Sequence, residues 1–121
     1  MKINIIFVNI DILNMTIQNL ITILDEWAPT AYAEDFDNVG LLVGDARKEC
    51  LGALITLDCT EDVMEEAINK KCNLIISFHP IVFSGLKKIT GKNYVERVVI
   101  KAIQNDIAIL ALHTRLDNHP K

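Results

Sequence analysis

Asn73-Leu74-Ile75-Ile76-Ser77-Phe78-His79-Pro80 is the stretch of sequence that decides the fold. Its apolar half predicts a buried strand that carries the imidazole of His79 at its carboxyl end, where Pro80 keeps the preceding backbone extended. A second apolar run, residues 107–112, leads into His113-Thr114-Arg115-Leu116-Asp117. Ligands of open α/β sheets bind at the carboxyl ends of the strands. Two such strand ends suggest a metal site, although a single histidine after a strand can also serve only to anchor a loop.

Helices and further strands surround these two runs in a regular order. Thr16, Thr60 and Asn93 each stand where a helix N-cap is expected, ahead of apolar residues spaced three and four apart. Pro29 ends the first of these helices. The predicted order is helix, strand, strand, helix, strand, helix, strand, over residues 16–28, 39–44, 51–57, 60–71, 73–77, 93–104 and 107–112.

The strands from residue 51 onward are continuous apolar runs, which is typical of parallel strands covered on both faces. The helices between them predict right-handed crossovers. We therefore expect an α/β fold, with a parallel or mixed sheet and flanking helices, in one domain over residues 15–121. Residues 1–14 are either an edge strand or an unstructured extension, and Met15 is a second possible start of the functional chain.

Composition argues against several classes of function. The net charge is −4 and the lysines are scattered, so the chain lacks the basic face that direct nucleic-acid binding needs. No apolar run approaches the roughly 18 residues of a membrane span. The three cysteines have no Cys-x-x-Cys spacing, which argues against a thiolate zinc site and for buried thiols in a reducing compartment. The expected location is the cytoplasm, with mitochondria and nucleus left open, because residues 1–14 carry no convincing targeting signal.

Other residues near the predicted strand ends offer weaker candidates. Asp58 follows the second predicted strand and ends at the same edge as His79, but its simpler role is to organise the start of the next helix. Cys59 carries no sign of an activated nucleophile, and His119 is expected in solvent. The loop at residues 85–91 has glycine, lysine and threonine without P-loop spacing, so a nucleoside triphosphatase is excluded. Its lysines could still attract an anionic substrate.

Five motifs in a fixed order extend this interpretation. They are Glu26-Trp27-Ala28-Pro29, Ala33-Glu34-Asp35-Phe36-Asp37-Asn38-Val39-Gly40-Leu41-Leu42-Val43-Gly44, Ser77-Phe78-His79-Pro80-Ile81-Val82-Phe83, Leu86-Lys87-Lys88-Ile89-Thr90 and His113-Thr114-Arg115-Leu116-Asp117. From about Thr16 to Asp117 the chain resembles the Nif-three-like proteins, also called GTP cyclohydrolase I type 2 homologues. The resemblance implies the N-terminal half of an α/β fold with a two-metal site inside a ring-shaped homo-oligomer.

The same resemblance implies two metal ligands in this chain. His79 matches a ligand of the family's His-His-Pro motif, and Asp117 matches the aspartate that closes its His-Thr-x-x-Asp motif. His113 opens that second motif and would lie beside the site. The bound ion would be a divalent metal (zinc, iron or manganese), and the sequence does not choose among them.

Two departures from the family pattern weaken the expectation of two metals. Phe78 stands where the first histidine of the His-His-Pro motif would be, and the sequence ends at Lys121, before the family's distal histidine and glutamate. His79 and Asp117 are too few to close a tetrahedral site without water or a neighbouring chain. We therefore expect a fragment or shortened paralogue that self-associates through the face that the other half would cover.

Three functions are consistent with these residues. The first is a metal-dependent hydrolase acting on a nucleotide-like small molecule, with His79 and Asp117 as ligands. The second is a non-catalytic protein-interaction or transcription-regulatory scaffold, whose role would go through a protein partner. The third is an inactive truncated fragment. The metal content of the purified chain separates the first function from the other two.

Overall fold

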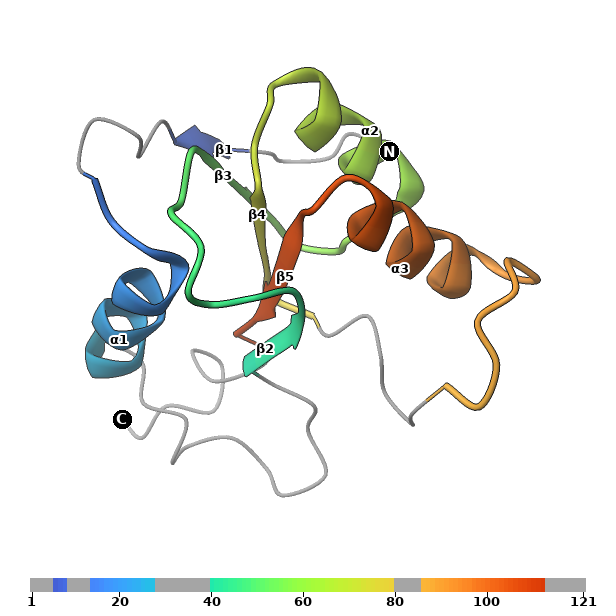
Figure 1. The fold of residues 1–121 in the computed structure, drawn as a ribbon, viewed down its shortest axis with the longest axis horizontal. Helices are drawn as coiled ribbons and strands as arrows, with labels where there is room; N and C mark the ends of the chain where they lie inside the picture. Colours follow the sequence, from blue (N-terminus) through green and yellow to red (C-terminus); the bar gives the residue numbers. More distant parts are fainter. Residues whose placement is uncertain (1–5, 9–13, 28–39, 80–85, 113–121) are drawn as a thin grey trace.

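The computed structural model describes residues 6–8, 14–27, 40–79 and 86–112, which form a five-stranded sheet with three helices (Figure 1). The elements are β1 (Ile6–Val8), α1 (Ile17–Trp27), β2 (Gly40–Val43), β3 (Ala53–Thr56), α2 (Glu61–Asn69), β4 (Leu74–Ser77), α3 (Tyr94–Gln104) and β5 (Ala108–Ala111). Across the sheet the order is β1-β3-β4-β5-β2. Strands β3, β4 and β5 run parallel, whereas β1 and β2 pair antiparallel with β3 and β5 at the two edges.

The parallel centre of the sheet is apolar because helices cover both of its faces. Every residue of β4 and β5 is buried, including Ser77. The prediction of an α/β fold with a parallel or mixed sheet is confirmed, and the sheet is mixed. The predicted strands extend beyond the observed ones by one or two residues, because apolar residues next to a strand, such as Leu57 and Leu112, prolong the pattern without joining the strand.

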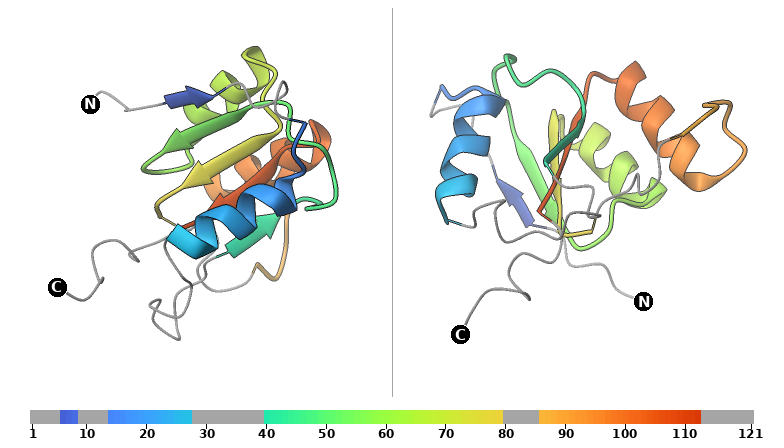
Figure 2. Two further views of the ribbon diagram at one scale, coloured as in Figure 1. Left: turned by 90° about the vertical axis from the view of Figure 1, so that its left-hand side faces the viewer. Right: turned by 90° about the horizontal axis from the view of Figure 1, so that it is seen from below.

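Helix α1 lies on one face of the sheet, and helices α2 and α3 lie on the other (Figure 2). Helices α2 and α3 bury Met64 and Val98 against β3, β4 and β5, and α1 buries Ile17 on the opposite face. The spacing of apolar residues in the predicted helix 93–104 places Val95, Val98, Val99, Ala102 and Ile103 on one buried face. This prediction is wrong at Ile103, which is 63% exposed. All three cysteines are free and buried, which confirms the prediction of buried thiols; they are Cys50, Cys59 and Cys72.

All three predicted N-caps are present. The side chains of Thr60 and Asn93 accept hydrogen bonds from backbone amides three residues later, at 3.3 and 2.9 Å. Thr16 and Asn19 cap α1 reciprocally, each side chain accepting from the other residue's backbone amide (3.1 and 2.9 Å). Each cap satisfies a backbone N–H group that has no partner within its helix.

Helices α2 and α3 also end alike. Lys71 and Asp106 follow them with left-handed backbone (φ 59° and 57°), a conformation that closes helices but is normally taken by glycine. The next amide then reaches a carbonyl five residues back: Cys72 to Ala67 at 2.9 Å, and Ile107 to Ala102 at 2.8 Å. These turns bring the chain directly from each helix into the next parallel strand.

The edge strands complete the sheet. Residues 6–8 form β1, which supports the edge-strand alternative for this part of the first fourteen residues. Strand β2 pairs with β5 through a register shift between Leu41 and Val43, and Gly44 follows it with φ 113°. A Cβ atom on Gly44 would lie 2.6 Å from the Cβ of Ala108, so only glycine fits there without a shift of the backbone.

Candidate functional site

The candidate site lies at the carboxyl edge of the parallel strands. Asp58 follows β3 and His79 follows the neighbouring strand β4, and because the two strands are parallel their ends meet at one edge. The parallel ladder continues past the strands, with the amides of Phe78 and His79 donating to the carbonyls of Thr56 and Leu57 (3.1 and 3.0 Å). This register sets the backbone of His79 beside the segment that carries Asp58.

The side chains of Asp58 and His79 are in direct contact. Nδ1 of His79 lies 2.7 Å from Oδ1 of Asp58, and the two side chains are 46% and 52% exposed. A carboxylate accepts hydrogen bonds and cannot donate, so Nδ1 carries the proton in this contact. The simpler role predicted for Asp58, organising the start of α2, is filled instead by Thr60. The sequence placed both residues at this edge but did not predict that they bond to each other.

Two buried hydroxyls support the backbone beneath this pair. Thr56 and Ser77 are register partners on β3 and β4, and both are almost fully buried. The Thr56 hydroxyl donates to the carbonyl of Asp58 (3.0 Å), and the Ser77 hydroxyl donates to the carbonyl of His79 (2.6 Å). In each strand, the hydroxyl of the last residue therefore holds the backbone carbonyl of the residue two positions later. Sequence analysis did not identify these hydroxyls, whose only signal was a polar residue near the end of an otherwise apolar run.

Cys59 is excluded as a nucleophile at neutral pH. Burial raises the pKa of its thiol to about 12, and the thiolate is the reactive form of cysteine. Its side chain belongs to the apolar core under α2 and α3. The prediction that this thiol is buried is confirmed.

The lysine-bearing loop before α3 is organised by a glutamate that sequence analysis missed. Oε1 of Glu96 accepts from the backbone amides of Thr90, Gly91 and Lys92 at 2.9–3.0 Å. Hydrogen bonds from the amides of Lys92 and Thr90 lower the pKa of the Glu96 carboxyl. Asn93 followed by Glu96 is the spacing of a capping box, and this pattern could have revealed the contact. Lys87 is exposed and lies on the loop that this carboxylate holds.

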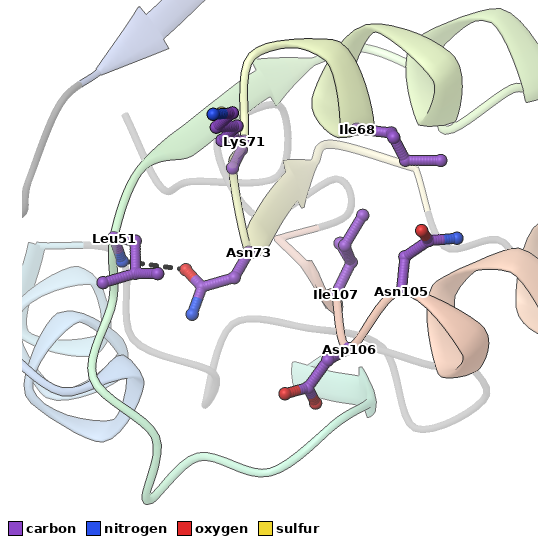
Figure 3. Close-up of a pocket in the computed structure, with 8 residues that line it drawn as sticks. Leu51, Ile68, Lys71, Asn73, Asn105, Asp106 and Ile107 are labelled. Atoms are coloured by element: carbon purple, nitrogen blue, oxygen red, sulfur yellow. Dashed lines mark hydrogen bonds between the residues drawn. The ribbon is translucent and has the colours of Figure 1, made fainter.

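A pocket of about 240 Å³ lies at the opposite, amino edge of the strands (Figure 3). Its polar groups are largely bonded to backbone: the Asn73 amide accepts from the N–H of Leu51 (2.9 Å) and donates to the carbonyl of Glu49 (2.8 Å). Asn105 likewise donates to the carbonyl of Lys101. These contacts join the turns between elements, so this pocket is not the candidate site.

Comparison with known proteins identifies the family. Residues 15–121 match the family described as Duf34/NIF3 (NGG1p interacting factor 3). The chain belongs to the Duf34/NIF3 family. A GTP cyclohydrolase 1 type 2 homolog of Clostridium acetobutylicum is 42% identical over 106 residues, which are 88% of this chain and 40% of that protein.

Solved structures of NIF3 relatives share the fold. A hypothetical protein of Staphylococcus aureus is 46% identical with a TM-score of 0.81, over 86% of this chain and 34% of that one. A Bacillus cereus protein related to NIF3 is 36% identical with a TM-score of 0.82, over 86% and 29%. The chain thus spans less than half the length of these relatives. The predicted family and its α/β fold are confirmed.

The residues expected to bind metal in this NIF3 chain are only partly described. His79 is in place at the edge of the sheet, whereas Asp117, His113 and His119 lie outside the described residues. Within the described ranges, no three side chains of His, Cys, Asp or Glu gather closely enough to hold a metal ion. Imidazole nitrogen and carboxylate oxygen are nevertheless the donors that zinc, iron and manganese take, and a metal-bound histidine commonly bonds a carboxylate through its other nitrogen. The pair fits one part of such a site.

No helix in the described part of this NIF3 chain combines the length and the apolar character needed to cross a membrane.

Proposed function

We propose that this chain is a divalent-metal-dependent hydrolase acting on a nucleotide-like small molecule, with His79 and Asp117 as metal ligands. The observation that carries the proposal is the contact of 2.7 Å between His79 and Asp58 at the carboxyl edge of adjacent parallel strands. An imidazole hydrogen-bonded to a carboxylate is the usual arrangement of a metal-bound histidine. The name of the relatives, GTP cyclohydrolase 1 type 2 homolog, supports a nucleotide-like substrate.

Each residue has a stated part in this proposal. His79 holds the metal through its imidazole, and Asp117 supplies a carboxylate oxygen. A divalent metal in such a site lowers the pKa of bound water toward ~7 and so supplies a nucleophile at neutral pH. Exposed Lys87 and Lys88 attract the negative charge of a nucleotide through their ammonium groups. The backbone amides of residues 90–92 do not take part, because they donate to the carboxylate of Glu96.

Metal content of the purified chain tests the proposal. The protein is loaded separately with zinc, ferrous iron and manganese, freed of excess metal and measured by elemental analysis. We expect near-stoichiometric binding of at least one of these ions, and at least a tenfold lower content in His79→Ala and Asp117→Ala. His119→Ala removes an imidazole close to Asp117 in the sequence and serves as the matched control. The metal-loaded protein is then incubated with GTP and the products are examined by mass spectrometry for added water.

The outcomes separate the candidate functions. Wild-type protein that takes up none of the three ions would contradict the metal-dependent hydrolase. Metal-free protein would instead favour the second candidate, a protein-interaction scaffold, which is supported by the family's description as an NGG1p interacting factor. Protein that binds metal but forms no product from GTP would support the metal site and contradict GTP as the substrate.

We also propose a cytoplasmic homo-oligomer. Two ligands do not complete a tetrahedral site, and a second copy of the chain is one source of the others. The acidic net charge argues against a direct nucleic-acid partner. Light scattering should give a mass of two or more chains, and a stable single-chain mass would contradict the homo-oligomer.

A further inference from the structure

We infer that Asp58 is the positioning residue of the proposed metal site, holding the His79 ring so that Nδ1 is protonated and Nε2 is the nitrogen for metal. This inference rests on the proposed function and adds to it a residue that the ligand motifs do not include. The carboxylate of Asp58 contacts the His79 ring, and its proposed effect on metal binding goes through that ring.

The contact itself fixes which nitrogen carries the proton. Nδ1 of His79 lies 2.7 Å from a carboxylate oxygen of Asp58, and a carboxylate only accepts. Neutral free histidine prefers the opposite tautomer, with the proton on Nε2, which blocks that nitrogen as a ligand. Asp58 therefore selects the form of His79 whose Nε2 has a lone pair to give.

The backbone on both sides of the contact is fixed. The buried hydroxyls of Thr56 and Ser77 bond to the carbonyls of Asp58 and His79, as described above. Beyond Asp58 the chain enters α2 through the N-cap Thr60, whose hydroxyl accepts from the amide of Val63. Asp58 thus lies on a segment of few residues held at both ends, which is what a residue that orients a ligand requires.

The structure also removes the main competing role for Asp58. An aspartate shortly before a helix can serve to cap it, but Thr60 occupies the cap position of α2, and the Thr60 carbonyl accepts from the amide of Met64. The carboxylate of Asp58 instead contacts the ring of His79, two residues beyond the end of the adjacent strand β4. Its side chain is therefore not needed to start the helix.

Nitrogen NMR of the metal-free protein tests the inference directly. The 121-residue chain labelled with ¹⁵N is recorded at pH 8, and the His79 signals are assigned by their loss in His79→Ala. We expect the proton on Nδ1 in wild-type protein and predominantly on Nε2 in Asp58→Ala. Asp58→Asn gives a second variant of nearly the same shape, in which the amide can donate to Nδ1 and again favour a proton on Nε2.

Zinc affinity supplies the functional readout. Competition with a chromophoric chelator should show affinity for Zn²⁺ lower by about 10- to 100-fold in both Asp58 variants, as is usual when the partner of a metal-bound histidine is removed. Asp62→Asn, in the first turn of α2, is the matched control: it makes the same change of charge close by and should keep the wild-type tautomer and affinity. Circular dichroism confirms that each variant is folded.

The results distinguish the two claims. A His79 ring that keeps its proton on Nδ1 in folded Asp58→Ala, or that has it on Nε2 in wild-type protein, overturns the inference while wild-type metal binding can still stand. Wild-type protein that binds no zinc, iron or manganese overturns the proposed function, whatever the tautomer. An equal loss of affinity in Asp62→Asn would assign the effect to net charge and also overturn the role of Asp58.

Discussion

At the amino edge of the parallel sheet, the side chains of Asn73 and Asn105 bond to the backbone, whereas at the carboxyl edge the side chains of Asp58 and His79 bond to each other. Asn73 links the turns before β3 and β4 through two backbone contacts. At the other end of the same strands, Nδ1 of the half-exposed His79 lies 2.7 Å from Oδ1 of the half-exposed Asp58. The two edges therefore differ in their contacts: the amino edge joins turns of the fold, and the carboxyl edge carries the pair on which the proposed metal site rests. Changes at the amino edge should therefore affect stability alone, and changes at the carboxyl edge should also affect metal binding.

Gly44→Ala should give the largest effect, and it lies at the amino edge. The new Cβ would stand 2.6 Å from that of Ala108, at a φ of 113° that alanine rarely adopts. Backbone strain and overpacking together should lower the free energy of unfolding by about 3 kcal/mol. Urea unfolding measures this loss. Where the variant remains folded, the His79 tautomer should be that of wild-type protein, and a changed tautomer would break the comparison between the edges.

Thr56→Val should have a smaller effect on stability and a second effect on the site. Valine keeps the shape but leaves the carbonyl of Asp58 without its buried hydroxyl donor, at a cost of about 1–2 kcal/mol. Because that carbonyl belongs to the residue bonded to His79, zinc affinity should also fall several-fold. Thr56→Ser retains the hydroxyl and should restore the affinity even where stability is incompletely recovered. A loss of stability with unchanged affinity would assign the hydroxyl to folding only.

Glu96 should give a pH-dependent effect confined to the loop before α3. Amide donors hold the pKa of its carboxyl below the ordinary value of 4.5, so its contribution to stability is complete above that value and is lost as pH falls through the lowered folded-state pKa. Glu96→Gln keeps one acceptor oxygen but does not titrate. The difference in unfolding free energy between the two proteins should therefore shrink on acidification from pH 6 to pH 3. A difference that is the same at both pH values would contradict the role of the charge.

The sequence predicted the fold better than it predicted the site, for a physical reason. Apolar runs and N-caps are local patterns, so the strand before His79 and the helix after Thr60 could be located from the chain alone. The bond between Asp58 and His79 depends on the register of two strands separated by a helix, which no local pattern contains. The prediction that Ile103 lies on the buried face of α3 was wrong, because the apolar spacing along the helix continues to a residue that faces solvent. Asp117 was assigned by resemblance and lies outside the described residues, so its role as a ligand stays a prediction.

Lys71→Gly should give a small effect and a gain in stability. Lys71 holds a left-handed backbone at the end of α2 (φ 59°), which costs a residue with a Cβ about 1–2 kcal/mol. Glycine removes that cost, but it also raises the conformational entropy of the unfolded chain, which lowers stability. We therefore expect the free energy of unfolding to rise by a net of roughly 0.5–1 kcal/mol. Asp106 has the same conformation after α3, but its carboxylate pairs with Lys48. Asp106→Gly relieves the backbone strain and also removes this ion pair, so its net effect on the free energy of unfolding should be close to zero. Thermal unfolding of the two variants measures this contrast. Because both positions lie at the amino edge, neither change should alter zinc affinity, and a shift in affinity from Lys71→Gly would show that the two edges are coupled.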